Sequence, residues 1–380
     1  MTNFLSYAHE KQAEIVAFIS QLAACESPSD SPAAVNRLVD LLIERTADIA
    51  SPKTFESSHF GKTLRLHFNL PGDGKQGQIL ALGHSDTVWP LGTVKHMPVN
   101  VADGRLWGPG VLDMKSGLAF FVFAMRALRD LQIAVPHEVV LLIASDEEVG
   151  STSSRPITEE EAKRSKCVLV LEPGTGFAGK LKTARKGVGD YRVLIKGKAA
   201  HAGVDFNSGA SAIVEAARQI SEIAKFTDLP RGITVNPGVI SGGTRSNVIA
   251  GTAEIHVDIR VNRLPDAAEL DAKFRALKPI DDRCSVSVEG GLNRPPMERT
   301  NEIAALYLKA RALGRAIGLD IEESSTGGGS DGNFTAALGI PTLDGLGGVG
   351  EGAHAPNESI LLDRVADRVA LLAGLVAESL

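Results

Sequence analysis

Residues 137–148, HEVVLLIASDEE, form a continuous apolar run that ends in three acidic residues. Residues 78–86 (QILALGHSD) and 166–174 (KCVLVLEPG) repeat this pattern of a short apolar run followed by polar residues. Such runs are typical of strands buried on both faces of a parallel or mixed sheet. The apolar segment 114–131 lies between the first two runs along the chain and has the length of a packed helix. Together these segments predict an α/β fold, in which helices flank a mixed, largely parallel sheet.

A second kind of pattern begins at about Lys186. Strands with one solvated face are expected where apolar and polar residues alternate, as they do in 187–197 and 247–261. The helix expected over 208–226 carries apolar residues at helical spacing: Ile213, Val214, Ala217, Ile220 and Ala224. With a strand at 232–243, a helix at 264–277 and a strand at 284–291, the order is β-α-β-β-α-β. This order predicts a ferredoxin-like α+β domain.

The α/β pattern resumes after residue 294. Helices are expected at 302–318 and from 330, and the closing segment 360–380 is expected to form a long amphipathic helix. The economical interpretation is one α/β domain made of residues 1–185 and 295–380. Residues 186–294 would form an inserted lid or dimerisation domain.

Composition excludes several classes of protein. The chain has 380 residues, which favours two domains, and its net charge of -6 gives no electrostatic footprint for nucleic acid. Its apolar runs are too short to span a bilayer, and residues 1–24 predict an amphipathic helix, in contrast to a signal peptide. Cys25, Cys167 and Cys284 have no metal or redox spacing, so we expect reduced thiols in a cytoplasmic protein.

Glu147 and Glu148 are adjacent at the end of the apolar run 138–144. If this segment is extended, neighbouring side chains point in opposite directions. One carboxylate could then hold a metal while the other faces a substrate. Metal-assisted hydrolysis needs this division between a Lewis acid and a proton acceptor.

Other potential metal ligands follow apolar runs or precede a helix. With Glu148, they are His84, Asp113, Glu172 and His354. In an open α/β sheet, ligands gather beyond the carboxyl ends of the strands. Two imidazoles and three carboxylates exceed the needs of one zinc but match two metals that share a carboxylate. Any one of these residues alone could simply cap a strand, so only the whole set favours a metal centre.

Seven motifs occur in order along the chain: GHSDTV, GPGVLDMKSG, DEEVGS, LEPG, KAAHAG, RSNVIAG and GGGSDGN. This series resembles the co-catalytic zinc aminoacylase/carboxypeptidase family, from about Leu82 to His354. The family includes bacterial glutamate carboxypeptidase, succinyl-diaminopimelate desuccinylase and acetylornithine deacetylase. Residues 289–299 and 325–347 are most similar to glutamate carboxypeptidase.

The resemblance implies roles for the metal ligands. Asp113 would bridge two metals, His84 and Glu172 would bind one, and Glu148 and His354 would bind the other. Two zinc ions per subunit are expected, although these ligand types also accept cobalt or manganese. The family also carries a cis peptide bond after the bridging aspartate, here between Asp113 and Met114.

Two more residues beside the metals acquire roles. Glu147 would be the general base and acid. Asp86 follows His84 by two residues and would orient that imidazole by accepting a hydrogen bond from it.

Within the inserted domain, the resemblance implies that His201 enters the active site of the partner subunit in a homodimer. There it would stabilise the developing oxyanion. Asn247 and Arg260 would contact the substrate. From the residues alone, His201 would be an ordinary surface or core histidine, and Arg260 would be solvent-exposed.

Two further candidates could bind a substrate carboxylate. Arg294 could form a bidentate clamp, and it could equally be a loop arginine. The run 327–330 offers backbone N–H groups before a helix, so Gly328 and Gly329 could form a carboxylate nest. A flexible turn is the simpler interpretation of such a run.

We therefore predict a dinuclear zinc-dependent hydrolase of an amide or peptide bond, most similar to glutamate carboxypeptidase. Its substrates would be N-acyl amino acids or short peptides, and neither nucleic acid nor membrane is an expected partner. The alternatives are a deacylase of the acetylornithine or succinyl-diaminopimelate type, or an aminoacylase. A dinuclear aminopeptidase is less favoured, because such relatives tend to place Asp where this chain has Glu172. A non-catalytic binding homologue would be expected to lack the base or a ligand.

Overall fold

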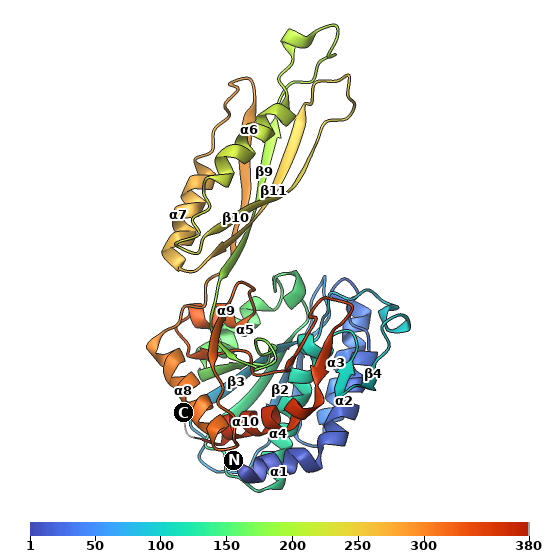
Figure 1. The fold of residues 1–380 in the computed structure, drawn as a ribbon, viewed down its shortest axis with the longest axis vertical. Coiled ribbons are helices and arrows are strands. Elements are labelled where there is room, and N and C mark those ends of the chain that lie inside the picture. The colour runs from blue at the N-terminus through green and yellow to red at the C-terminus, as the bar shows by residue number, and fades with distance from the viewer. Residues whose placement is uncertain (379–380) are drawn as a thin grey trace. The chain divides into compact units, whose positions relative to one another are not determined.

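The structure is a computed structural model that describes residues 1–378, and its chain divides into two compact units (Figure 1). Unit 1 comprises Met1–Ala184, Arg299–Ser325 and the residues from Ser330 onward. Unit 2 comprises Arg185–Glu298 and Thr326–Gly329. The short segment 326–329 therefore belongs to unit 2, whereas the sequence patterns assigned it to the second part of the α/β domain.

Unit 1 is built on a six-stranded sheet with the order β1-β2-β6-β3-β7-β14. β3 is parallel to β6 and β7, and β7 is parallel to β14, whereas β1, β2 and β6 pair antiparallel. This confirms the predicted mixed, largely parallel sheet. The strands are β1 (Ala50–Phe55), β2 (Thr63–Phe68), β3 (Gln78–His84), β6 (Glu138–Ala144), β7 (Ser165–Val170) and β14 (Thr342–Leu343).

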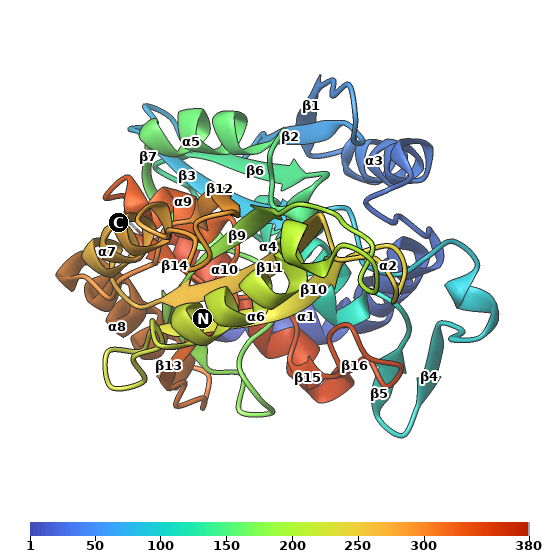
Figure 2. The same ribbon diagram turned by 90° about the horizontal axis from the view of Figure 1, so that it is seen from above.

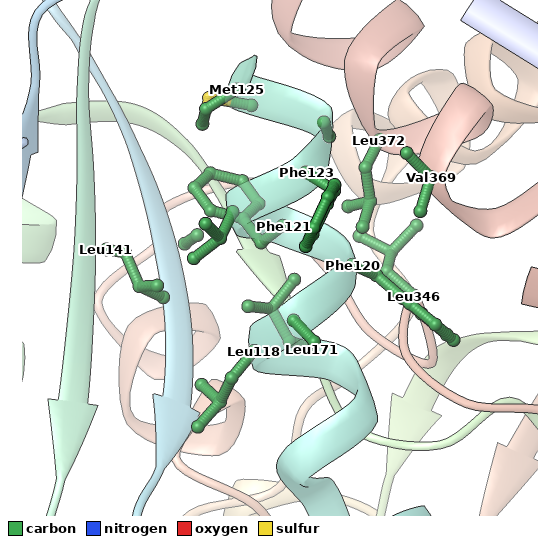
Figure 3. Packing of buried hydrophobic residues seen from close by; sticks show 14 of the residues in the cluster. Leu118, Phe120, Phe121, Phe123, Met125, Leu141, Leu171, Leu346, Val369 and Leu372 are labelled. Atoms are coloured by element: carbon green, nitrogen blue, oxygen red, sulfur yellow. The ribbon is translucent and has the colours of Figure 1, made fainter. Parts of the chain in front are cut away.

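Both faces of the central strands are buried, as their continuous apolar runs predict. α4 (Ser116–Asp130) is the central helix of the larger core, between the sheet, represented by Leu141, and α10 (Val365–Ala377), represented by Val369 and Leu372 (Figure 3). A second cluster on the opposite face includes residues of β3, β6, β7 and α5 (Arg155–Lys163). The remaining helices of unit 1 are α1 (Thr2–Glu10), α2 (Gln12–Ala24), α3 (Pro32–Thr46), α8 (Asn301–Arg315) and α9 (Gly332–Ala337).

Two small sheets complete unit 1. β4 (Asn100–Ala102), β5 (Arg105–Trp107), β16 (Ser359–Leu361) and β15 (Gly350–Glu351) form an antiparallel sheet beside the loop that carries His354. β8 (Leu181–Arg185) pairs with β13 (Glu323–Thr326).

The closing segment differs from the predicted amphipathic helix. It starts as strand β16, and the helix that follows is buried at every position from Val365 to Val376. Its polar residues do not form a solvated face: the Arg368 guanidinium donates to the carbonyls of Gly179 and Gly345 inside the protein. Residues 379–380 of the predicted helix lie outside the described residues.

Unit 2 has the predicted order β9 (Gly187–Lys196), α6 (Ala212–Ala224), β10 (Thr234–Gly242), β11 (Thr252–Val261), α7 (Leu264–Arg275) and β12 (Ser285–Arg294). Its four strands pair antiparallel in the order β10-β11-β9-β12. α6 and α7 pack on one face of this sheet (Figures 1 and 2). The arrangement confirms the ferredoxin-like prediction.

The buried face of α6 includes polar residues, while some of its apolar residues are exposed. Ile213 and Val214 are exposed, whereas the polar residues Glu215 and Gln219 are buried. The Glu215 carboxylate accepts the N–H groups of Ile280 and Asp281, so this buried charge is satisfied by the loop after α7. Hydrophobic periodicity cannot reveal such a polar contact, so the apolar spacing predicts the helix but does not identify its buried face.

All three cysteines are free, as predicted. The N-terminal segment forms two helices, α1 and α2, where one was expected. Among residues 1–378, the helices are all too short or too polar to cross a membrane.

Candidate metal centre and active site

The carboxyl ends of three neighbouring strands carry predicted ligands. His84 is the last residue of β3, Glu172 follows β7 by two residues, and Glu148 follows β6 by four. Because β3, β6 and β7 are parallel, these ligands meet at one edge of the sheet. Asp113 comes from the turn before α4, and His354 from the loop between β15 and β16.

These residues form two groups of three that share Asp113. In one group, His84 Nε2 lies 3.2 Å from Asp113 Oδ1 and 3.6 Å from Glu172 Oε1. In the other, His354 Nε2 lies 3.3 Å from Asp113 Oδ2 and 3.2 Å from Glu148 Oε1. Within each group, the ligand atoms all lie within 4.8 Å of one another.

The spacing suits two metal ions. Tetrahedral ligands about 2 Å from one zinc ion lie roughly 3.3 Å from each other, close to the separations found here. The two oxygens of Asp113 face different histidines, as a bridging carboxylate requires. The donor set of imidazole and carboxylate is also one that zinc accepts.

In the metal-free protein, the same contacts change the acidity of the ligands. Hydrogen bonds with Asp113 and Glu148 raise the pKa of His354 to about 10. Although burial opposes it, the carboxylates of Asp113 and Glu172 raise the pKa of His84 well above its ordinary value. Although burial favours a higher pKa at Asp113, the two imidazoles hold the pKa of this carboxyl well below its usual range. Burial raises the pKa of Glu148.

The turn that carries Glu147 and Glu148 is not extended, which corrects the sequence-based expectation. β6 ends at Ala144, and Glu147–Val149 form a 3₁₀ turn. With three residues per turn, successive side chains still diverge by about 120°. Glu148 thus reaches His354, while Glu147 lines a small cavity together with His84 and Glu172.

Asp86 lies beside His84, but its carboxylate is not the nearest acceptor. His84 Nδ1 lies 2.9 Å from the backbone carbonyl of Asp86 and 3.6 Å from its Oδ1. A backbone carbonyl can fix the orientation of a metal-binding imidazole as a carboxylate does. The Asp86 carboxylate instead accepts the N–H groups of Glu147 (3.2 Å) and Glu148 (3.1 Å) and the hydroxyl of Ser29 (2.8 Å). Its main contact is therefore with the turn that carries both glutamates.

Two predicted residues of unit 2 lie together at one end of its sheet. His201 pairs with Val248 in an isolated bridge, and Ala202 N donates to the carbonyl of Asn247 at 2.9 Å. His201 is exposed, and its Nδ1 accepts the N–H groups of Gly203 and Val204, both at 3.1 Å. In the neutral imidazole the proton is then on Nε2, which can donate a hydrogen bond.

The other predicted residues of unit 2 gather around the segment 327–329. Arg260 donates to both oxygens of Asp258 and, at 3.3 Å, to the carbonyl of Gly327. Arg294 is buried and lies against Gly329, where an added Cβ would be 2.8 Å from its Cδ. The Gly328 N–H donates to the Thr326 hydroxyl at 3.4 Å. A carboxylate nest would need this N–H to be available to the ligand.

Within unit 2, His201 and Asn247 lie far from the residues gathered around the segment 327–329. β9 and β11 pair from Lys196 and Thr252, at the end near His201, to Gly187 and Val261, at the end near Arg260. Ten-residue strands span about 30 Å.

Residues 80–378 match the family described as Peptidase family M20/M25/M40. The chain belongs to this family. It is 30% identical over 311 residues to carboxypeptidase G2 of Pseudomonas sp. (strain RS-16), covering 80% of this chain and 75% of that protein. The sequence is therefore that of an M20 metallopeptidase, a hydrolase of the peptidase and aminoacylase type, and the predicted family and enzyme class are confirmed.

Two solved structures share the fold at lower identity. Aminopeptidase PepT from Bacillus cereus is 24% identical, with a TM-score of 0.77 and coverage of 96% of this chain and 98% of that one. The YXEP protein of Bacillus subtilis, described as a dinuclear metal binding peptidase from the M20 family, has a TM-score of 0.70 and 14% identity. The aligned region covers 98% of this chain and 100% of the YXEP chain.

The sequence patterns missed two residues of this M20 site. Ser29 contacts Asp86, and Glu358 contacts the backbone of Asp113. Ser29 does not have the residue type of a usual zinc ligand, and Glu358 does not directly follow one of the apolar runs that marked His84, Glu148 and Glu172. The one available signal was that Glu358 follows His354 by four residues in the same loop.

Proposed function

We propose that this M20 peptidase is a two-zinc enzyme of the glutamate carboxypeptidase type, which releases a C-terminal amino acid from N-acyl amino acids or short peptides. The observation that carries the proposal is the pair of ligand groups that share Asp113, next to the cavity lined by Glu147. The likeness to carboxypeptidase G2 over most of the chain supports the choice of substrate class.

In this proposal, His84 and Glu172 would hold one metal, Glu148 and His354 would hold the other, and Asp113 would contribute to both. When bound, the metals would polarise the scissile carbonyl and lower the pKa of the attacking water. Glu147 accepts the proton of that water and later returns it to the leaving amine. Asp86 and Ser29 fix the backbone of the turn from which Glu147 projects.

Arg260 and Arg294 are the proposed contacts for the substrate's terminal carboxylate. A guanidinium presents a planar fork of N–H donors that matches a carboxylate. Arg294 is only 5% exposed, so its charge is poorly screened by water. Arg260 is already paired with Asp258, which keeps the planar group oriented in the same cluster. Asn247, Gly328 and Gly329 remain proposed substrate contacts.

A homodimer through unit 2 is part of the proposal. His201 and Arg260 lie at opposite ends of one sheet, so a single copy of unit 2 cannot present both to one small substrate. In a dimer, His201 of one subunit would donate its Nε2–H to the oxyanion formed in the site of the other. The edge strand β10 offers a surface for such pairing, because Val239 is 60% and Ile240 is 50% exposed. The free cysteines suit a cytoplasmic location.

A substrate panel tests the proposal. Zinc-loaded protein would be assayed with N-acylglutamates, folate-like glutamate conjugates, acetylornithine, succinyl-diaminopimelate and a tripeptide with a free N-terminus. We expect release of glutamate from the first two classes and little turnover of the others. Preference for acetylornithine or succinyl-diaminopimelate would identify a deacylase, and preference for the tripeptide would identify an aminopeptidase. Either result would overturn the proposed specificity, while activity indifferent to chelators would overturn the metal mechanism. Replacement of zinc by cobalt or manganese in the same assay identifies the preferred metal.

A further inference from the structure

Glu358 is a fully buried carboxylate at 0% exposure, next to the metal centre but absent from the ligand set. Its Oε1 accepts the backbone N–H groups of Leu112 (2.9 Å) and Asp113 (3.0 Å). Its Oε2 accepts the N–H of Gly110 (2.9 Å) and the indole N–H of Trp89 (2.8 Å). Four donors converge on one side chain, and a carboxylate, which has two accepting oxygens and no donor of its own, suits all of them.

The four donors belong to two segments that carry metal-site residues. Trp89 lies on the loop that follows His84 and Asp86, and the three backbone donors lie in the turn that ends at Asp113. Glu358 itself belongs to the loop of His354. Its backbone carbonyl also accepts the N–H of Gly108 at 3.2 Å. One residue thus ties together the three loops that supply His84, Asp113 and His354.

The side chain of Asp113 has to keep one orientation, because its two oxygens face His84 and His354 at the same time. A bridging carboxylate that rotates or shifts would weaken both metal positions together. His354 also has a φ of 61°, a left-handed conformation that a residue other than glycine adopts at a cost. Its loop therefore needs an anchor, and Glu358, four residues later, supplies hydrogen bonds on both its backbone and its side chain.

We propose that Glu358 is a positioning residue, which holds the backbone of Asp113 and the loop of His354 in the arrangement that binds two metals. The inference rests on the proposed two-metal function. Glu358 acts through Asp113 and does not touch the reacting atoms. A role in packing alone is the competing explanation, and the two differ in what an isosteric change should do.

Glu358→Gln keeps the volume but replaces one accepting oxygen with an NH₂ group, which would face two N–H donors. We expect metal affinity, measured by competition with a chelator, to fall about 10- to 100-fold, as for other residues that orient metal ligands. At subsaturating zinc, kcat should fall together with the metal affinity. KM should change little, because Glu358 does not contact Arg260 or Arg294, the proposed substrate-binding residues. Glu161→Gln is the matched control: it alters another buried glutamate of unit 1, which is bonded to Arg65 and Gln78. Zinc affinity of this control should equal that of the wild type.

A double-mutant cycle separates positioning from packing. Trp89→Phe removes one of the four donors and keeps an aromatic ring, so it should lower zinc affinity by a smaller factor. In this background Glu358→Gln should cost less than in the wild type, because one donor that would oppose the new NH₂ group is gone. If Glu358→Gln does not fold, the reduced zinc affinity of Trp89→Phe remains a test.

The outcomes are distinct. Wild-type affinity in Glu358→Gln, or unchanged affinity in Trp89→Phe, would overturn the positioning role. A wild-type protein that binds fewer than two metals per chain would instead overturn the proposed function on which it rests.

Discussion

At the scale of single residues, two neighbouring carboxylates have different surroundings because of the turn that carries them. Glu148 contacts His354, whereas Glu147 lines the cavity next to His84. Both backbone N–H groups are held by one carboxylate, that of Asp86.

Ser29→Ala should weaken the support of the glutamate turn. The mutation removes the hydroxyl that donates to Asp86 Oδ2 at 2.8 Å in a buried site. We expect the free energy of unfolding to fall by roughly 1.5–3 kcal/mol, the usual contribution of a hydrogen bond to a charged group. Chemical denaturation measures this change, and activity should fall several-fold.

Ser20→Ala is the matched control for this prediction. The Ser20 hydroxyl only donates to the carbonyl of Val16 within its own helix. Equal losses of stability in the two variants would show that the Ser29 contact has no special importance.

Metal binding should release protons. The hydrogen bonds with Asp113 and Glu148 raise the pKa of His354 to about 10, so this imidazole is charged at pH 7 in the metal-free protein, and the pKa of His84 is shifted in the same direction. A metal binds only the neutral imidazole, so protons should leave when the two metals bind, that of His354 among them. Titration calorimetry in buffers of different ionisation enthalpy counts them. Because raised pKa values favour the protonated form, metal affinity should rise with pH toward about 10. Affinity that is independent of pH between 6 and 8 would contradict this explanation.

At the scale of elements, α4 places Asp113 beside Glu172 through a close backbone contact. Gly117, in the first turn of α4, lies against the carbonyl of Leu171, the residue before Glu172. A Cβ at Gly117 would lie 2.1 Å from that oxygen, so only glycine permits the approach.

Gly117→Ala therefore tests this contact by the sign of its effect. Helix propensity alone predicts that alanine stabilises the protein by about 1 kcal/mol. The contact predicts the reverse: a loss of stability and a lower metal affinity, because α4 and the loop of Glu172 must separate. Thermal unfolding with and without zinc measures both effects. A raised Tm with unchanged zinc affinity would show that the contact is unimportant.

The helices and strands also show which parts of the fold and of the candidate site could be predicted from the sequence. Apolar runs predicted β3, β6 and β7, and the residue types beyond them indicated His84, Glu148 and Glu172 as candidate ligands, because both follow from local pattern. The buried face of α6 was not predictable, since Glu215 is buried only because the distant residues 280 and 281 donate to it. The contacts of Glu358 were not predictable for the same reason, because its hydrogen-bond donors lie 245 to 269 positions earlier in the chain.

At the scale of the whole molecule, the proposed site needs residues from both ends of unit 2, and a second subunit would supply one set. Ile240→Lys should test this by placing a charge on the exposed edge strand β10. We expect a monomer by light scattering and a large loss of kcat, because His201 could no longer reach the site of a partner.

Leu308→Lys is the control for this prediction, since Leu308 is 57% exposed on α8 of unit 1. This variant should keep the oligomeric state and activity of the wild type. A fully active monomer of Ile240→Lys would contradict the proposed contribution of His201 across a dimer.

Zinc content and kcat, measured in the wild type and in Glu147→Gln, test whether Glu147 is the proton acceptor of a two-metal hydrolase. Loss of a general base lowers turnover by about 10²- to 10⁴-fold. We expect two zinc ions per chain in both proteins, with a loss of kcat of this size in the variant alone. Turnover close to that of the wild type, or loss of zinc together with activity, would contradict the assignment of Glu147 as the proton acceptor of a two-metal hydrolase.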